Sequence, residues 1–380
     1  MKRLVAWVVL LSLLAGCGRS AVPYAREMGD MALLRTMGLD VAGDGVELTV
    51  STGKQSGGRP ALVLSASGPS VAAASRSVQG LGDSYVYFGH VDQMLLGEEL
   101  AARGVGPILD HLAREPQLGL GVDLWVVRDG RAAQAVLTGG EAGVPARLDR
   151  LEADAGAGGA GIDCTALQLM SDLARGASVC IPALTLAPAR EGDGGSGTGQ
   201  TLLADGYAVI RQGKLVCFLQ GDEALGLELL RQRADGHVVD IDLRNGLRVC
   251  LRLEKTSVRC EPVFRDGELT GLNVVCALSA RVAQTERPLS PEQLAEVMQS
   301  FELLEGERMV AALERAQYWD ADFLGLEYLA RRSSPSRKDD IERVWQDVFR
   351  SLTIRVEVTG DVEGSAGMMD KGAEHGQTEG

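Results

Sequence analysis

Apolar and polar positions along the chain predict helices and strands in mixed order. Short apolar or alternating runs are typical of strands, whereas apolar positions recurring every three or four residues are typical of helices. The segments expected as strands are 46–50, 59–68, 85–97, 122–130, 178–188, 207–219, 247–264, 269–286 and 352–362. The segments expected as helices are 31–40, 70–82, 98–115, 162–176, 221–233, 290–332 and 338–349. This order favours an α/β fold or a mixed α+β fold.

The clearest local signal is the start of the helix expected at residue 290. Ser290 is a good N-cap, Pro291 suits the first helical position, and Gln293 completes a capping box. Apolar residues then follow at helical spacing, and we expect the pattern to reach about Arg332 with a break at Gly306.

Polar and glycine-containing steps predict the turns between strands. Gln212 and Gly213 are expected to join two short strands. In the meander that follows, hydrophilic breaks at Glu254–Ser257 and Arg265–Glu268 predict two turns. The segment 98–115 is expected to be helical in two parts, broken at Gly104–Pro107.

The N-terminus has the pattern of a secretory signal. Lys2 and Arg3 precede an apolar run, Leu4–Leu14, whose 11 residues are fewer than the about 20 needed to span a bilayer. Leu14-Ala15-Gly16-Cys17 resembles the bacterial lipobox, in which the chain is cut before a diacylglycerylated cysteine. We therefore expect cleavage between Gly16 and Cys17, with Cys17 carrying the S-diacylglycerol and an N-acyl chain. The alternative is an ordinary signal peptide with a chance cysteine.

Charge argues against some partners. The net charge is -14, with 38 basic and 52 acidic residues, and removal of Lys2 and Arg3 with residues 1–16 makes it -16. Nucleic-acid binding needs a basic footprint, so the excess of acid argues against that class. It also argues against adsorption to anionic lipid by charge alone.

Candidate catalytic and metal-binding patterns are scarce. The chain has no HExxH, no GxSxG and no CxxC motif. None of its four histidines lies at metal-ligand spacing from a cysteine. Asp110 and His111 could form a general-base dyad on paper, but adjacent helical residues point about 100° apart. The glycine-rich stretch 190–199 lacks the GK[ST] ending of a phosphate loop. We expect neither catalytic residues nor a metal site.

Six cysteines remain after Cys17. Most lie within apolar strand patterns, which favours buried thiols over disulfides. The alternative is pairing, in which Cys250 and Cys260 would face each other across a hairpin. The pattern leaves both interpretations open.

Composition and element order suggest a division into segments. At 380 residues, two or three domains are expected behind the leader. The expected segments are a signal peptide 1–16, a lipidated tether 17–29, an N-terminal region 30–190, a linker 191–200, a C-terminal region 201–362 and a disordered tail 363–380.

Five segments in order resemble one family, the GerAC or Ger(x)C spore germination lipoproteins, which are C subunits of nutrient germinant receptors. The lipobox is the first. The most specific is 87–137, where Gly97-Glu98-Glu99, Gly104, Pro107–Asp110 and Arg114 match the family pattern "GEELA-KGI-PILDFL-R". The other three matching segments are 26–40, 206–230 and the end, 318–332 with 344–360. The chain departs from the family pattern at Gly18, at Cys217 and around Leu324–Glu327.

The resemblance implies a mixed α/β protein of about three small domains, with central sheets flanked by helices. It implies a non-catalytic, lipid-anchored subunit on the outer face of the spore inner membrane. Its implied partners are membrane-embedded A-type and B-type subunits, with no cofactor. It leaves direct nutrient binding open, so the alternative function is an extracytoplasmic solute-binding lipoprotein. A lipid-anchored cell-wall hydrolase is a third class, which lacks a supporting motif.

Overall fold

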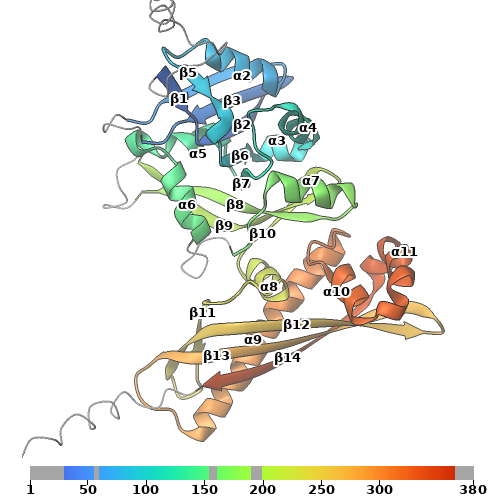
Figure 1. The fold of residues 1–380 in the computed structure, drawn as a ribbon. Coiled ribbons are helices and arrows are strands. Elements are labelled where there is room, and N and C mark those ends of the chain that lie inside the picture. Colours follow the sequence, from blue (N-terminus) through green and yellow to red (C-terminus); the bar gives the residue numbers. More distant parts are fainter. Residues whose placement is uncertain (1–29, 55–59, 154–160, 190–198, 364–380) are drawn as a thin grey trace, which may run out of the picture.

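The chain folds into two bodies, with helix α8 (Asp222–Leu230) at their junction (Figure 1). The computed structural model describes residues 30–54, 60–153, 161–189 and 199–363. The N-terminal body comprises the described residues up to Leu219, and the C-terminal body runs from Asp222 to Glu363. Within the described residues the strands form sheets of two, eight and four strands. The expected mixed α/β fold, with several sheets flanked by helices, is confirmed.

The N-terminal body is built on the eight-stranded sheet, in the order β10-β9-β8-β7-β6-β2-β3-β4. The four central strands are parallel, and the strands at both edges are added by antiparallel pairs. The strands are β2 (Thr36–Ala42), β3 (Gly45–Ser51), β4 (Val63–Gly68), β6 (Gln93–Gly97), β7 (Asp123–Val127), β8 (Val179–Pro188), β9 (Gln200–Arg211) and β10 (Lys214–Leu219). A parallel pair, β1 (Met31–Leu33) and β5 (Tyr85–Tyr87), forms the small sheet.

Helices cover both faces of the eight-stranded sheet, as a buried parallel centre requires. One apolar core packs beneath α2 (Val71–Gln79), α3 (Glu98–Arg103), α4 (Gly106–Arg114) and α7 (Ala166–Ala174). A second core on the opposite face packs beneath α5 (Ala132–Leu137) and α6 (Pro145–Ala153). Short 3-10 turns are η3 (Phe88–His90) and η4 (Gly140–Ala142). The break within 98–115 is confirmed, because α3 ends at Arg103 and α4 begins at Gly106.

The C-terminal body is a four-stranded sheet with helices against one face (Figure 1). Its strands are β11 (Val238–Asp242), β12 (Arg248–Arg265), β13 (Glu268–Thr285) and β14 (Thr353–Glu363), and β14 pairs with β13 in parallel. Its helices are α8 (Asp222–Leu230), α9 (Pro291–Tyr318), α10 (Leu326–Ser333) and α11 (Lys338–Val348), with short turns η6 (Pro335–Arg337) and η7 (Phe349–Ser351). None of the described helices is long and apolar enough to cross a membrane.

The helix expected at 31–40 is wrong, because this stretch forms β1 and β2. Ala, Leu, Met and Arg are good helix formers, but β2 pairs with β3 on one side and β6 on the other. Gly38 also lets α5 approach, since a Cβ there would lie 3.0 Å from Val136 and 3.1 Å from the Ala132 carbonyl oxygen. Long-range pairing therefore overrides local propensity.

The turn expected at Glu254–Ser257 is also wrong. β12 continues through it, and the polar residues coincide with a shift in register between Leu253 and Lys255. A bulge accommodates an extra polar residue without ending a strand. The turn at Arg265–Glu268 is confirmed, with Asp266 and Gly267 both at positive φ.

The start of α9 is confirmed in detail. Ser290 and Gln293 form both halves of the capping box, and Pro291 occupies the first turn. The break expected at Gly306 is wrong, since α9 continues to Tyr318 before the chain turns into α10. A single glycine costs a helix only about 1 kcal/mol, which the packing of α9 on β14 outweighs.

The expected linker joins neighbouring strands of one sheet. The end of β8 pairs with the start of β9, with Pro188 opposite Gln200, so residues 200–219 complete the N-terminal body. The expected linker 191–200 therefore does not separate the two bodies. The chain passes from one body to the other at Gln220 and Gly221. Residues 191–198, the signal peptide, the tether and 364–380 lie outside the described residues.

The six cysteines of the described residues are free thiols. Four are buried, while Cys217 and Cys250 are half-buried. The alternative pairing of Cys250 with Cys260 is wrong, because both lie on β12 and face Gln284 and Val274 of β13.

We expect Gly226→Ala to lower the free energy of unfolding by about 2 kcal/mol. A Cβ at this α8 position would collide with the Arg308 backbone oxygen of α9. Gly306→Ala is the matched control, since its Cβ would meet only Val358 at 3.5 Å and should stabilise α9 by up to about 1 kcal/mol. Urea unfolding measures both variants. Equal effects of the two substitutions would contradict close packing of α8 on α9.

Candidate functional site

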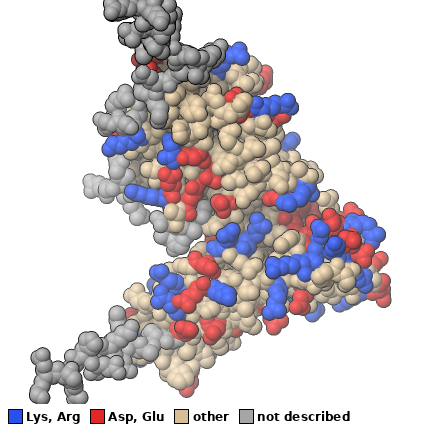
Figure 2. Space-filling view, in the orientation of Figure 1, with Lys and Arg blue, Asp and Glu red and all other residues tan. Residues whose placement is uncertain are grey.

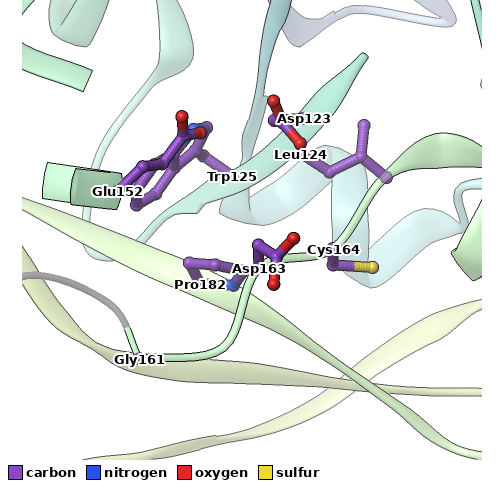
Figure 3. A pocket seen from close by; sticks show the side chains of 8 residues that line it. All are labelled: Asp123, Leu124, Trp125, Glu152, Gly161, Asp163, Cys164 and Pro182. Carbon is purple, nitrogen blue, oxygen red and sulfur yellow. The ribbon is translucent and has the colours of Figure 1, made fainter. Parts of the chain in front are cut away.

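A pocket in the N-terminal body gathers three carboxylates from separate segments (Figure 3). Its volume is about 240 Å³. Asp123 and Trp125 come from β7, Glu152 from the end of α6, and Asp163 from the loop that leads into α7. The other lining residues are Leu124, Gly161, Cys164 and Pro182.

Hydrogen bonds fix one wall of the pocket. The buried Trp125 donates its indole N–H to the Gln93 side-chain oxygen at 2.7 Å. The Gln93 amide nitrogen donates in turn to Glu152 Oε1 at 3.0 Å. Since Gln93 is itself buried, the amide holds the indole and the carboxylate in one arrangement.

Burial of Glu152 and Asp123 changes the protonation of these two carboxylates. Burial raises the pKa of Glu152 to about 7, with a further contribution from the charge of Asp123. Burial and the neighbouring charge of Asp163 raise the pKa of Asp123 to about 6. Both groups therefore exchange protons close to neutral pH.

The pocket lacks an activated nucleophile among its lining residues. Burial raises the pKa of Cys164 to about 12, so this side chain stays a thiol at neutral pH and is a poor nucleophile. Within the described residues, no group of three or more His, Cys, Asp or Glu side chains could hold a metal ion. The arrangement can bind protons or a small cationic group.

The pocket lies at the amino ends of parallel strands. Gln93 begins β6 and Asp123 begins β7. Ligands of open α/β sheets bind instead outside the carboxyl ends of the strands. There, Asp40 accepts hydrogen bonds from the backbone N–H groups of Ala132 (2.9 Å) and Ala133 (2.8 Å) and caps α5. These hydrogen bonds give Asp40, at the carboxyl end of the sheet, a structural role.

The residues singled out in the sequence lie elsewhere. Gly16 and Cys17 are outside the described residues. Asp110 bonds to Arg114 at 2.9 Å, one helical turn away, and this bond lowers the pKa of Asp110. The pocket carboxylates escaped sequence reasoning because 52 acidic residues offer no spacing that marks these three.

Comparison with known proteins assigns the chain to a family. Residues 24–185 match the family model of the spore germination protein N-terminal domain, and 205–366 match the C-terminal model described as spore germination B3/GerAC-like. This chain belongs to the GerAC family of spore germination proteins. The resemblance stated from its sequence is confirmed.

Two further similarities agree with GerAC membership. The chain is 22% identical over 372 residues to YfkR of Bacillus subtilis (strain 168), a protein named for spore germination, with 92% of each chain covered. The crystal structure of the GerBC protein has the same fold, with a TM-score of 0.55 and 18% identity. It covers 91% of this chain and 99% of that one.

We expect Glu152→Gln to reduce the pH dependence of stability. Since the pKa of Glu152 rises from 4.5 to about 7 on folding, the folded state binds the proton more tightly than the unfolded chain. The free energy of unfolding should therefore fall as pH rises from about 4.5 to about 7. The variant should gain about 1 kcal/mol at pH 8 relative to wild type, after allowing for solvent screening.

Urea unfolding between pH 4.5 and pH 8 measures this effect. Glu141→Gln is the control, because Glu141 is an exposed glutamate of the same body. An unchanged pH slope in Glu152→Gln would contradict the raised pKa.

Proposed function

We propose that this GerAC-family protein is a lipid-anchored, non-catalytic subunit of a spore nutrient germinant receptor. It is required for germination through assembly with membrane-embedded A-type and B-type subunits. One observation carries the proposal: Leu14-Ala15-Gly16-Cys17 occurs in a chain whose two halves both match the family models. The proposed location is the outer face of the spore inner membrane.

The place where the chain enters the fold supports an anchor at this end. The first strand begins at Met31, beside β5, at the end of the N-terminal body that lies away from the four-stranded sheet (Figure 1). Residues 18–30 separate Cys17 from this strand, and 13 residues reach at most about 45 Å when extended. A lipid on Cys17 would therefore hold the N-terminal body within that distance of the membrane.

Anchoring makes assembly possible without a strong contact surface. Two or more acyl chains give stable membrane attachment, whereas one chain binds reversibly. Confinement near the membrane raises the effective concentration of the body next to its partners. Figure 2 shows Asp and Glu side chains interspersed with Lys and Arg over both bodies, and the acidic excess of the mature chain would suit docking to partner surfaces of opposite charge.

We expect Cys17→Ala to leave the protein unprocessed or to release it from the membrane, because the acyl acceptor is gone. Triton X-114 partitioning and the mass of the N-terminal peptide report lipidation. Germination of spores carrying the variant as the sole copy should fall. Cys250→Ala is the matched control, since Cys250 is a half-buried free thiol of β12.

Two results would contradict the anchoring role. One is a wild-type protein whose mature N-terminus carries no lipid on Cys17. The other is normal germination of Cys17→Ala spores in response to every nutrient.

Calorimetric titration of residues 20–363 with amino acids distinguishes the proposal from solute binding. We expect no saturable heat, because the described residues that line the pocket include three carboxylates and no Lys, Arg or His that could pair with the carboxylate of an amino acid. Saturable binding that Glu152→Gln abolishes would favour the solute-binding alternative.

A further inference from the structure

Helix α8 of the C-terminal body lies at the junction, where it packs on the rest of its own body and on the N-terminal body. Its buried residues are Ala224, Gly226, Leu227, Glu228, Leu229 and Leu230. One side packs on α9, where Gly226 lies against the Arg308 backbone. Leu227 and Leu230 belong to the same apolar core as Cys180, Tyr207 and Val209 of the eight-stranded sheet. The two bodies therefore share one continuous core around α8.

A carboxylate sits inside this shared core. Glu228 is 6% exposed, and its Oε1 accepts hydrogen bonds from the Tyr207 hydroxyl and, at 3.3 Å, from the Gly161 backbone N–H. The Tyr207 oxygen in turn accepts from the Ile162 N–H at 3.1 Å. Two residues of the N-terminal body, Tyr207 and Gly161, thus bond to one side chain of the C-terminal body.

The other carboxylate oxygen faces the C-terminal body. Oε2 of Glu228 lies 3.0 Å from His237 Nε2, just before β11. Glu305 of α9 is 2% exposed, interacts with His237 and is paired with Arg308 at 2.6 Å. Arg308 also reaches Asp222 at 3.2 Å. We call Tyr207, Glu228, His237, Glu305 and Arg308 the junction cluster.

A contribution to the stability of the junction does not explain the cluster well. Burying a carboxylate costs several kcal/mol in desolvation, and apolar side chains of similar volume often stabilise as well or better. Apolar contact is non-directional, whereas charge-assisted hydrogen bonds fix distance and angle. Burial also raises the pKa of Tyr207, so its hydroxyl keeps the proton that it donates. The hydrogen bonds of the cluster therefore fix the relative orientation of the groups that they join.

We propose that the junction cluster is an orientation lock, which holds the two bodies at one angle so that they move as a single unit. The covalent connection alone would not do this, because it contains Gly221, and a glycine backbone can adopt several conformations. A second contact, Arg211 of β9 with Asp320 after α9 at 2.5 Å, lies on the surface of the same junction. The lock goes beyond the proposed anchoring role and does not depend on it.

Pulsed dipolar EPR on the full chain tests the lock. A ketone-bearing amino acid replaces Leu167 of α7 and Leu303 of α9, which are 56% and 64% exposed, and each carries a nitroxide. Such labels leave the free cysteines in place. We expect one narrow distance distribution in the otherwise wild-type protein.

The test variants are Tyr207→Phe, which removes one hydroxyl, and Glu228→Gln, which removes the charge. Both should broaden the distribution or add a second, shifted population. Tyr85→Phe is the matched control, because the Tyr85 hydroxyl accepts from Gln117 within the N-terminal body. Its distribution should equal that of wild type.

An unchanged distribution in both test variants would overturn the lock, even where their melting temperatures fall. That result would make the cluster a buried polar network without control of orientation. If Glu228→Gln does not fold, Tyr207→Phe alone decides, because it retains every apolar contact of the ring.

Discussion

The arrangement of this protein depends on burying α8 on two sides at once. A helix buried all round must be apolar and must tolerate close neighbours. In α8 the leucines and alanine supply the apolar surface, and Gly226 allows the backbone of α9 to approach. The C-terminal core cluster consequently includes residues of β8, β9 and β10, which belong to the other body. The family's two domain models thus describe sequence regions whose folds are completed against each other.

Sequence reasoning succeeded where a signal is local and failed where long-range pairing decides. The capping box of α9 and the turn at Asp266-Gly267 are set by side chains within a few residues, and both are present as expected. The stretch 31–40 has helical composition, yet β2 is a central strand paired on both edges. The polar step after Leu253 likewise yields a bulge because β13 supplies a partner on its far side. Helices α5 and α6 were not anticipated at all.

The same distinction applies to the candidate sites. The prediction of a lipidation site at Cys17 rests on four consecutive residues and a preceding apolar run, so it needs no knowledge of the fold. The carboxylates of the pocket come from β7, α6 and the loop before α7, and only the sheet brings them together. The burial of Glu228 is even harder to predict, because a glutamate in a leucine-rich helix is expected to be solvent-exposed. Its hydrogen bonds are to Tyr207, 21 residues earlier, and to Gly161, 67 residues earlier.

The junction determines how far the proposed lipid anchor can restrain the whole molecule. The proposed lipid at Cys17 would restrain the N-terminal body alone, since the chain enters the fold there. If Gln220 and Gly221 acted as a free hinge, the C-terminal body would sample many orientations, and its contribution to assembly would be diluted accordingly. With α8 buried in a shared core and Glu228 bonded across it, tethering one body positions both. A short tether would then also orient the four-stranded sheet, which lies at the opposite end of the molecule (Figure 1).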